Sequence, residues 1–468
     1  MSPACFALCF LCFLLCIFPN IFFSSALHLP LTQFHTTPSR DPYQTLNHLV
    51  SSSLRRAHHL KNPRPTATKA GRATPATSTP LFSHSYGGYS ISLSFGTPPQ
   101  TLPFVMDTGS DIVWFPCTHR YLCKNCSFSS SSPSKNDIPS FIPKQSSSSR
   151  IIGCKNPKCS WIHHTNRTQC GDDCQNSPVP QNCTQACPPY IIFYGSGTTG
   201  GIALSENLNL GGDKTVRDFL VGCSVFSSRQ PAGIAGFGRG LPSLPSQLKL
   251  DKFSYCLISH RFDDSASSSA LILDSNSDLD KKTSGLTYTP FLQNPIAHEA
   301  FKVYYYIGLR KISVGGRRVK VPYKYLSPGE DGNGGAIVDS GTTFSFMARQ
   351  IFEPVAAEFV KQVKNYTRAR EVENLTGLRP CYDVKGRDNV EFPEMRLHLK
   401  GGAEVALPLE NYLAAVDGGA ACLTFVTDDG VGGQTGPAVI LGNFQMQNYY
   451  LEYDLRNERL GFKQQLCI

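Results

Sequence analysis

Charge is scarce in this 468-residue chain, because Asp, Glu, Lys and Arg make up 17% of it, below the quarter typical of globular proteins. Beyond residue 26 there is no apolar run of the roughly 20 residues that a membrane-spanning helix needs. The chain also lacks the glycine period of collagen and the heptads of a coiled coil, and a hydrophobic content of 41% excludes wholesale disorder. What it has is 39 glycines and 33 prolines, which favour a turn-rich β architecture of more than one domain.

The net charge of +9 is concentrated in one segment. Residues 27–85 contain seven lysines and arginines against the single Asp41, whereas residues 1–26 contain no charged side chain. A nucleic-acid site would place its basic residues on a folded face with interleaved aromatic residues, and this segment shows almost no apolar periodicity. We therefore interpret residues 27–85 as a solvated, removable propeptide and expect no nucleic-acid partner.

The N-terminus has the character of an export signal. From Ala4 to Ala26 the chain is almost wholly apolar, and Ser24, Ser25 and Ala26 are the small residues that a signal peptidase requires. No Lys or Arg precedes the apolar run, so an uncleaved signal anchor is the alternative. We predict that residues 1–26 are a signal peptide and that the cleaved protein has no stable membrane association.

Because the chain is predicted to be exported, we expect its cysteines to form structural disulfides. Four of the 18 lie within the signal, and the other 14 can form up to seven disulfides in an oxidising compartment. Nine of them fall between Cys117 and Cys187. Zinc ligation by these cysteines with His163 and His164 is the weaker alternative, because the spacing matches no zinc finger. Five Asn-x-Ser/Thr sequons agree with secretion: Asn125, Asn166, Asn182, Asn365 and Asn374.

Short β-rich runs separated by turn residues occupy most of the chain. Tyr86–Phe95 alternates large and small residues and predicts a strand, and Gly96–Pro99 predicts the turn after it. One helix is expected over Gln350–Asn365, where apolar residues recur every four positions. The polar stretch Ser265–Asp280 is the expected boundary region between two lobes.

The decisive pattern is an internal duplication. Phe104-Val105-Met106-Asp107-Thr108-Gly109-Ser110 returns in form as Ala336-Ile337-Val338-Asp339-Ser340-Gly341-Thr342. Each copy is followed by two apolar residues and a glycine, namely Ile234-Ala235-Gly236 and Ile440-Leu441-Gly442. One Asp-x-Gly motif carries little information, but two in matching context predict two similar lobes that present one aspartate each across a pseudo-twofold axis.

These residue types suit an acid–base site. The glycine lets each loop turn tightly after a short apolar strand, and the hydroxyls of Ser110 and Thr342 are expected to donate hydrogen bonds to the carboxylates. Two carboxylates held close in a shielded site share one proton, so their pKa values belong to the pair. The ionised member can take a proton from water while the protonated member polarises an amide carbonyl. Asp107 and Asp339 are therefore predicted to be a catalytic pair.

From about Tyr86 to its C-terminus the chain resembles the pepsin-type aspartic endopeptidases, in particular the plant nepenthesin-like branch. The loops containing Asp107 and Asp339 match the two catalytic motifs of the family, for which the shared proton is the known pattern. Tyr194 matches the tyrosine of the flap that covers substrate, and Trp114 matches the tryptophan whose indole meets it. The resemblance implies a mostly β, bilobal pepsin-like fold with pseudo-twofold related lobes, a cleft between them, and neither cofactor nor metal.

The cysteine-rich stretch 117–187 resembles the insertion of the nepenthesin-like branch. Its nine cysteines cannot all pair with one another, so one is expected to reach Cys223. The four that remain suggest a hypothesis of two disulfides: Cys381–Cys422 within the C-terminal lobe, and Cys256–Cys467 across to the tail.

The predicted organisation is a signal peptide (1–26), a basic propeptide (27–85), an N-terminal lobe (86–280) and a C-terminal lobe (281–468). The predicted function is a secreted aspartic endopeptidase of the apoplast or cell wall, or alternatively of the vacuole. We expect a monomer that cleaves polypeptides at acidic pH and is inhibited by its own propeptide. The alternative is a catalytically silent pepsin-fold binding protein such as a glycanase inhibitor, although a binder need not keep the hydroxyl partners of the aspartates.

Overall fold

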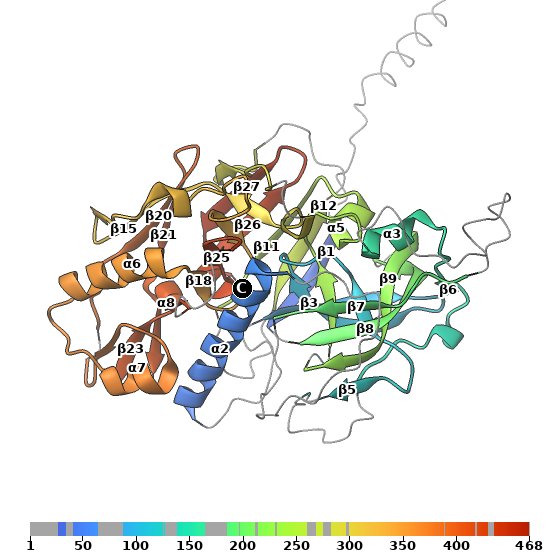
Figure 1. The fold of residues 1–468 in the computed structure, drawn as a ribbon, viewed down its shortest axis with the longest axis horizontal. Coiled ribbons are helices and arrows are strands. Elements are labelled where there is room, and N and C mark those ends of the chain that lie inside the picture. The colour runs from blue at the N-terminus through green and yellow to red at the C-terminus, as the bar shows by residue number, and fades with distance from the viewer. Residues whose placement is uncertain are drawn as a thin grey trace, which may run out of the picture.

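The computed structural model describes residues 27–33, 41–63, 88–124, 126, 138–163, 185–195, 197–210, 214–229, 232–259, 268–274, 282–295, 299–387, 389–416, 419–428 and 435–467. The predicted signal peptide lies outside these residues. Within them the protein is mostly β, and its strands form two lobes that lie side by side in Figure 1. No helix in the described ranges is long and apolar enough to cross a membrane.

The largest sheet contains strands from both lobes. Its strands are β1 (Leu27–Gln33), β2 (Tyr89–Phe95), β3 (Gln100–Asp107), β4 (Trp114–Pro116), β5 (Leu122–Lys124), β6 (Arg150–Ile151), β7 (Tyr190–Phe193), β8 (Thr198–Asn209), β9 (Thr215–Ser228), β10 (Gly233–Gly236), β11 (Lys252–Cys256), β12 (Ser268–Asp274), β13 (Thr287–Pro290), β26 (Tyr449–Asp454) and β27 (Arg459–Gln464). They follow the order β13-β27-β26-β11-β12-β1-β2-β3-β10-β4-β9-β8-β6, with β5 beside β9 and β7 beside β8. This sheet therefore ties the lobes together.

Three smaller sheets complete the C-terminal half. Their strands are β14 (Tyr305–Ile307), β15 (Leu309–Val314), β16 (Arg317–Arg318), β17 (Ala336–Val338), β18 (Ser345–Met347), β19 (Cys381–Asp383), β20 (Met395–Leu399), β21 (Glu404–Leu407), β22 (Leu413–Val416), β23 (Ala420–Leu423), β24 (Phe425–Val426) and β25 (Val439–Leu441). The strand orders are β14-β17-β25-β18-β24, β16-β15-β20-β21 and β19-β23-β22. The first of these sheets is the one that leads into the second aspartate loop.

Helices are short except for two. The α-helices of the described residues are α2 (Pro42–Lys61), α3 (Pro157–His163), α5 (Leu244–Leu248), α6 (Arg349–Gln362), α7 (Arg370–Thr376) and α8 (Leu409–Tyr412). The helix expected over Gln350–Asn365 is confirmed as α6, in which Ile351, Val355 and Phe359 are buried. It ends earlier than expected, because Val363 adopts an extended backbone at the C-cap.

The duplication in the sequence is also a duplication in space. β3 runs parallel to β10, which places Asp107 beside Gly236. β17 runs parallel to β25 in the same way, and the N–H of Asp339 donates to the carbonyl of Leu441 at 2.9 Å. Each aspartate loop therefore leaves a short buried strand whose parallel neighbour is the downstream apolar-glycine segment of the same lobe.

Part of the basic segment 27–85 is folded. β1 pairs antiparallel with β12 on one side and with β2 on the other. α2 follows the N-cap Asp41, whose carboxylate accepts a hydrogen bond from the N–H of Tyr43. The interpretation of this stretch as solvated is wrong for α2, because its apolar residues recur three, four or seven positions apart and form one buried face. These residues are Leu46, Leu49, Val50, Ala57 and Leu60.

The expected boundary region Ser265–Asp280 also contains a strand. β12 occupies Ser268–Asp274 and pairs with β1 and β11. These seven residues are therefore an internal part of the shared sheet rather than a free connection between the lobes.

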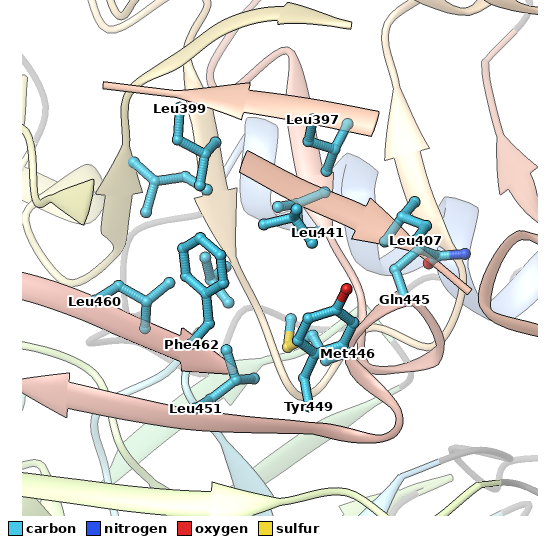
Figure 2. Close-up of a pocket in the computed structure, with 13 residues that line it drawn as sticks. Leu397, Leu399, Leu407, Leu441, Gln445, Met446, Tyr449, Leu451, Leu460 and Phe462 are labelled. Carbon is cyan, nitrogen blue, oxygen red and sulfur yellow. The ribbon is translucent and has the colours of Figure 1, made fainter. Parts of the chain in front are cut away.

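The C-terminal lobe encloses an apolar cavity of about 50 Å³. Figure 2 shows side chains from β20, β25, β26 and β27 surrounding it, among them Leu397, Leu441 and Phe462. Val338, the residue before Asp339, also lines the cavity. The lining is almost wholly apolar, so the hollow offers a water molecule few hydrogen-bond partners.

Candidate active site

Asp107 and Asp339 meet at the junction of the two lobes, and both are almost fully buried, at 2% and 0% exposed. The two loop glycines show how closely the lobes approach each other. A Cβ atom on Gly109 would lie 2.5 Å from Oδ1 of Asp339, and one on Gly341 would lie 2.6 Å from Oδ1 of Asp107. Only glycine at these positions lets each loop face the carboxylate of the other lobe.

Each carboxylate is held on both oxygens by its own loop. The N–H of Gly109 donates to Oδ1 of Asp107 at 3.0 Å, and Ser110 Oγ donates to Oδ2 at 2.7 Å. In the second loop the N–H of Gly341 donates to Oδ1 of Asp339 at 3.0 Å, and Thr342 Oγ1 donates to Oδ2. The Oδ1 atoms are thus the inner oxygens that face the other lobe, and the Oδ2 atoms are the outer ones.

Sequence reasoning assigned no role to the second residue of each loop, yet these residues lock the loops together. The N–H of Thr108 donates to Ser340 Oγ at 3.0 Å, and the N–H of Ser340 donates to Thr108 Oγ1 at 2.9 Å. The two hydroxyls then donate to carbonyls of the opposite strand, those of Val338 and Met106. This reciprocal set fixes the distance between the lobes at the aspartates. The available signal was a hydroxyl residue at the same place in both copies.

Arg56 of α2 forms ion pairs with both aspartates. Its Nη2 lies 2.6 Å from Oδ1 of Asp107 and 3.2 Å from Oδ1 of Asp339, and its Nε lies 3.0 Å from Oδ2 of Asp339. Nη2 therefore stands between the two inner oxygens. Figure 1 shows α2, in blue, crossing between the lobes. The sequence places Arg56, together with Arg55 and Lys61, in a basic propeptide that inhibits the enzyme, but it does not single out the residue that contacts the aspartates.

Arg56 shifts the pKa values of the two carboxyls to different extents. Burial, with the neighbouring charge of Asp339, raises the pKa of Asp107 to about 6, although Arg56 acts to lower it. Burial also acts to raise the pKa of Asp339, but the charge and hydrogen bonds of Arg56 and the bond from Thr342 bring it below its usual value. The two aspartates are therefore inequivalent while α2 is in place.

Tyr194 and Trp114, the residues predicted for the flap and its partner, contact each other. Tyr194 follows β7 and is 7% exposed. Trp114 Nε1 donates to the hydroxyl of Tyr194 at 3.0 Å, with the ring centroids 6.5 Å apart. A Cβ on Gly195 would lie 2.3 Å from the Cα of Arg56, so the loop after Tyr194 packs closely against the backbone of α2.

A third buried carboxyl lies next to the first loop. Asp111 is 8% exposed, and its Oδ1 accepts a hydrogen bond from the N–H of Gly240 at 2.9 Å. Cβ atoms at Gly236, Gly238 or Gly240 would all come within 2.3 Å of Asp111, so this glycine-rich loop wraps around it. Burial raises the pKa of Asp111 to about 7, against the Gly240 hydrogen bond and with a small further increase from Asp107. Sequence reasoning missed Asp111.

The cysteines form disulfides in several places. The structure joins Cys117–Cys223, Cys123–Cys126, Cys159–Cys187, Cys256–Cys467 and Cys381–Cys422. Cys159 and Cys187 lie with His163 as a group within 4.8 Å that could ligate a metal. Because the two sulfurs are bonded to each other and His163 Nε2 lies 3.0 Å from the carbonyl of Pro188, the group has no free thiolate to offer.

Of the sequons, Asn365 and Asn374 are exposed in the C-terminal lobe. Asn125, Asn166 and Asn182 lie outside the described residues.

A mostly β, bilobal fold in which each lobe contributes one aspartate on a matching loop is the fold of the pepsin-like acid proteases. Two family models match the chain: Xylanase inhibitor N-terminal over residues 89–273 and Xylanase inhibitor C-terminal over residues 304–464. A probable aspartyl protease of Arabidopsis thaliana is 34% identical over 427 residues, covering 81% of this chain and 82% of the relative. Aspartic proteinase nepenthesin-1 of Nepenthes gracilis is 31% identical over 390 residues, covering 81% and 78%.

Solved structures agree on the fold. The crystal structure of edgp has a TM-score of 0.63 at 20% identity and covers 96% of this chain and 97% of its own. The basic 7S globulin from soybean has a TM-score of 0.58 at 16% identity and covers 94% and 97%. The chain belongs to the pepsin-like aspartic protease family, in its plant nepenthesin-like branch.

Proposed function

We propose that this protein is an aspartic endopeptidase that hydrolyses peptide bonds at acidic pH. The observation that carries the proposal is the pair of inner oxygens on Asp107 and Asp339, which face one common position now filled by Nη2 of Arg56. A water molecule at that position would contact both carboxylates. Reciprocal bonds between the loops keep the two aspartates at a fixed separation.

The chemistry follows from the two hydrogen-bonded carboxyls. Once the arginine has left, the pair shares one proton, because two close carboxylates in a buried site do not both ionise. The ionised aspartate takes a proton from the water, and the water oxygen attacks the scissile carbonyl carbon. The protonated aspartate donates a hydrogen bond to the carbonyl oxygen and stabilises the charge that develops there. The aspartate that took the proton from water then returns it to the amide nitrogen as the C–N bond breaks and the amine leaves. Ser110 and Thr342 hold the outer oxygens in place throughout.

We propose further that residues 27–85 are a propeptide that blocks this site. α2 fills the cleft with Arg56 on the aspartates, and it is anchored by the N–H of Phe344, which donates to Ser53 Oγ at 2.9 Å. Tyr304 donates its hydroxyl to the carbonyl of Leu60 at 3.2 Å, and Lys61 pairs with Asp428 at 3.0 Å. Protonation of the dyad in acid removes partners from Arg56, which favours release of the helix.

Export is part of the proposal. The apolar residues 1–26, the disulfides and the exposed Asn365 and Asn374 support a secreted glycoprotein with a cleaved signal peptide, an N-terminal lobe (86–280) and a C-terminal lobe (281–468). The apoplast or cell wall is the proposed destination, with the vacuole as the alternative.

The test is cleavage of a denatured protein substrate by the acid-treated full chain between pH 3 and pH 7. Activity is expected to peak in acid and to fall at least about 10³-fold in both Asp107→Asn and Asp339→Asn. Asp383→Asn, an exposed residue of β19, is the matched control and should retain activity. A folded wild type that is free of its propeptide and still inert would contradict the proposal.

The second candidate is a pepsin-fold binding protein. It is favoured by the descriptions of the two matching family models, both of which refer to xylanase inhibitors. The complete hydrogen-bond set around both carboxylates speaks against it, because binding at an outer surface needs none of these bonds. Inhibition of a glycanase by both the wild type and Asp107→Asn, without proteolysis, would establish this candidate instead.

A further inference from the structure

Besides Arg56, α2 places a second cation in the cleft. Lys61, at the end of α2, is 6% exposed, and its Nζ lies 3.0 Å from Oδ2 of Asp428. The same Nζ lies 4.7 Å from the centroid of the Phe346 ring. The side chain of Asp428 is 11% exposed in this arrangement. A carboxylate and an aromatic face thus hold one ammonium group in a nearly closed setting.

The partners of Lys61 belong to the C-terminal lobe and not to the segment that leaves. Asp428 follows β24, and Phe346 lies within β18. When α2 leaves the cleft, Asp428 loses its ion-pair partner Lys61 and borders the space that the helix occupied. A chain that next occupies the cleft would cover this carboxylate again, so the site favours a chain that brings a new cation to it.

Space for such a chain exists around Asp428. It lines two hollows, one of about 500 Å³ that also includes Lys61 and one of about 490 Å³ along the outer side of α2. The charged neighbours in the first hollow are Asp331 and Lys324. Asp331 accepts hydrogen bonds from the N–H and side-chain amide of Asn333 at 3.0 and 2.6 Å, and the ammonium of Lys324 lies 5.1 Å from the Tyr325 ring. Both are engaged with their own loop.

The spacing of the two cations locates the site relative to the scissile bond. Lys61 follows Arg56 by five positions, which along a helix is about 7.5 Å. A substrate in extended conformation advances roughly 3.3 Å per residue. The two side chains also point about 140° apart around the helix axis, so Asp428 lies at least two residues away from the position at which the aspartates act.

We propose that Asp428, with the ring of Phe346, is a specificity subsite for a lysine or arginine at least two residues from the cleaved bond, and that Lys61 of the precursor occupies it as a substitute. This inference rests on the proposed function, since it names a substrate preference of the same cleft. In the precursor, Arg56 of α2 therefore covers the aspartates and Lys61 of α2 covers the subsite.

The experiment uses the acid-treated full chain at pH 5 and a set of internally quenched peptides with one cleavage site. Lysine is placed in turn at each of the three positions on either side of the bond, and each peptide is matched by one with methionine, which has a similar length and no charge. At one position, two or three residues from the bond, the lysine peptide is expected to show a kcat/KM about 10- to 100-fold higher, the range of a buried hydrogen bond to a charged group. In Asp428→Asn this ratio should fall to near one.

Asp331→Asn is the matched control, because it removes a carboxylate from the same hollow and should keep the ratio. A flat profile across all positions, or a ratio that survives in Asp428→Asn, overturns the inference while leaving the peptidase intact. If the wild type cleaves no peptide, the proposed function fails separately. Equilibrium binding of the same peptides to acid-treated Asp107→Asn, with and without Asp428→Asn, then measures the preference for lysine without catalysis, and equal affinities for the two peptides overturn it.

Discussion

Replacing Arg56 by glutamine should release the block on the cleft at near-neutral pH. The arginine side chain is 9% exposed, and its partners Asp107 and Asp339 are 2% and 0% exposed. Glutamine keeps much of the length but none of the charge. The other contacts of α2, those of Ser53, Leu60 and Lys61, stay in place, so the helix is expected to remain docked most of the time and to open more often.

The magnitude follows from the burial of the ion pairs. Removing one partner from a buried pair costs about 3–5 kcal/mol, and each 1.36 kcal/mol is a tenfold change in an equilibrium. The open fraction at pH 6.5 should therefore rise on the order of 10²- to 10⁴-fold. The effect shrinks in acid. While α2 is docked, both aspartates are ionised above a pH of about 6. When α2 is released, the aspartate pair keeps one shared proton. The released form therefore binds more protons, and docking of α2 weakens as the pH falls.

The assay is the initial rate of hydrolysis of a quenched peptide at pH 6.5 by full chain that has never been exposed to acid. Arg56→Gln is expected to exceed the wild type by about 10²-fold or more, and the two should become equal after acid treatment. Arg55→Gln is the matched control, since it changes the same charge one residue away. Burial and the charge of Arg229 lower the pKa of Arg55, and it forms no ion pair with an acidic residue in the described part of the chain. Equal rates for Arg56→Gln and wild type at pH 6.5 would refute the reasoning.

Three further predictions concern the surroundings of the aspartates. The unfolding free energy of the wild type should fall by up to roughly 4 kcal/mol between pH 4 and pH 8 because of Asp111. The pKa of Asp111 is about 7 in the folded protein against 3.8 unfolded, so the folded state holds the proton up to the higher pH. Denaturant unfolding of Asp111→Asn should show little of this loss, and an unchanged pH slope would contradict the prediction. Gly341→Ala places a Cβ 2.6 Å from Oδ1 of Asp107 and should lower kcat at least about 10²-fold, so near-normal turnover would show that the loops tolerate separation. Trp114→Phe removes the 3.0 Å bond to Tyr194 and should lower kcat/KM about tenfold, with Tyr194→Phe giving a similar loss; a much larger effect of one variant alone would show that the bond is not the cause.

Local patterns account for the parts of the site that could be predicted. Asp107 and Asp339 accept hydrogen bonds from residues two and three positions further on, so the short motif contains the whole loop. The apolar strand before each loop and the distant apolar-glycine segment also repeat in both copies. Duplication in the sequence was therefore enough to predict two lobes with one aspartate each.

Composition alone misjudged the segment before the lobes. Its basic residues predict a solvated stretch, because they dominate the composition and the apolar stripe of Leu46, Leu49 and Val50 is weak. The stripe stabilises a helix through packing against the C-terminal lobe, because most helical stability in proteins comes from burying an amphipathic face.

By itself the amino-acid sequence determined the paired aspartate loops, because their geometry depends on neighbours within three residues. Only the tertiary structure decided which of seven basic residues meets the aspartates, which carboxyl is enclosed by the glycines of a distant loop, and which acid receives Lys61. Arg56 is 51 residues from Asp107 and 283 from Asp339, and Lys61 is 367 residues from Asp428. Contacts at such separations follow from how the sheets and lobes pack, and no local pattern of residues encodes them.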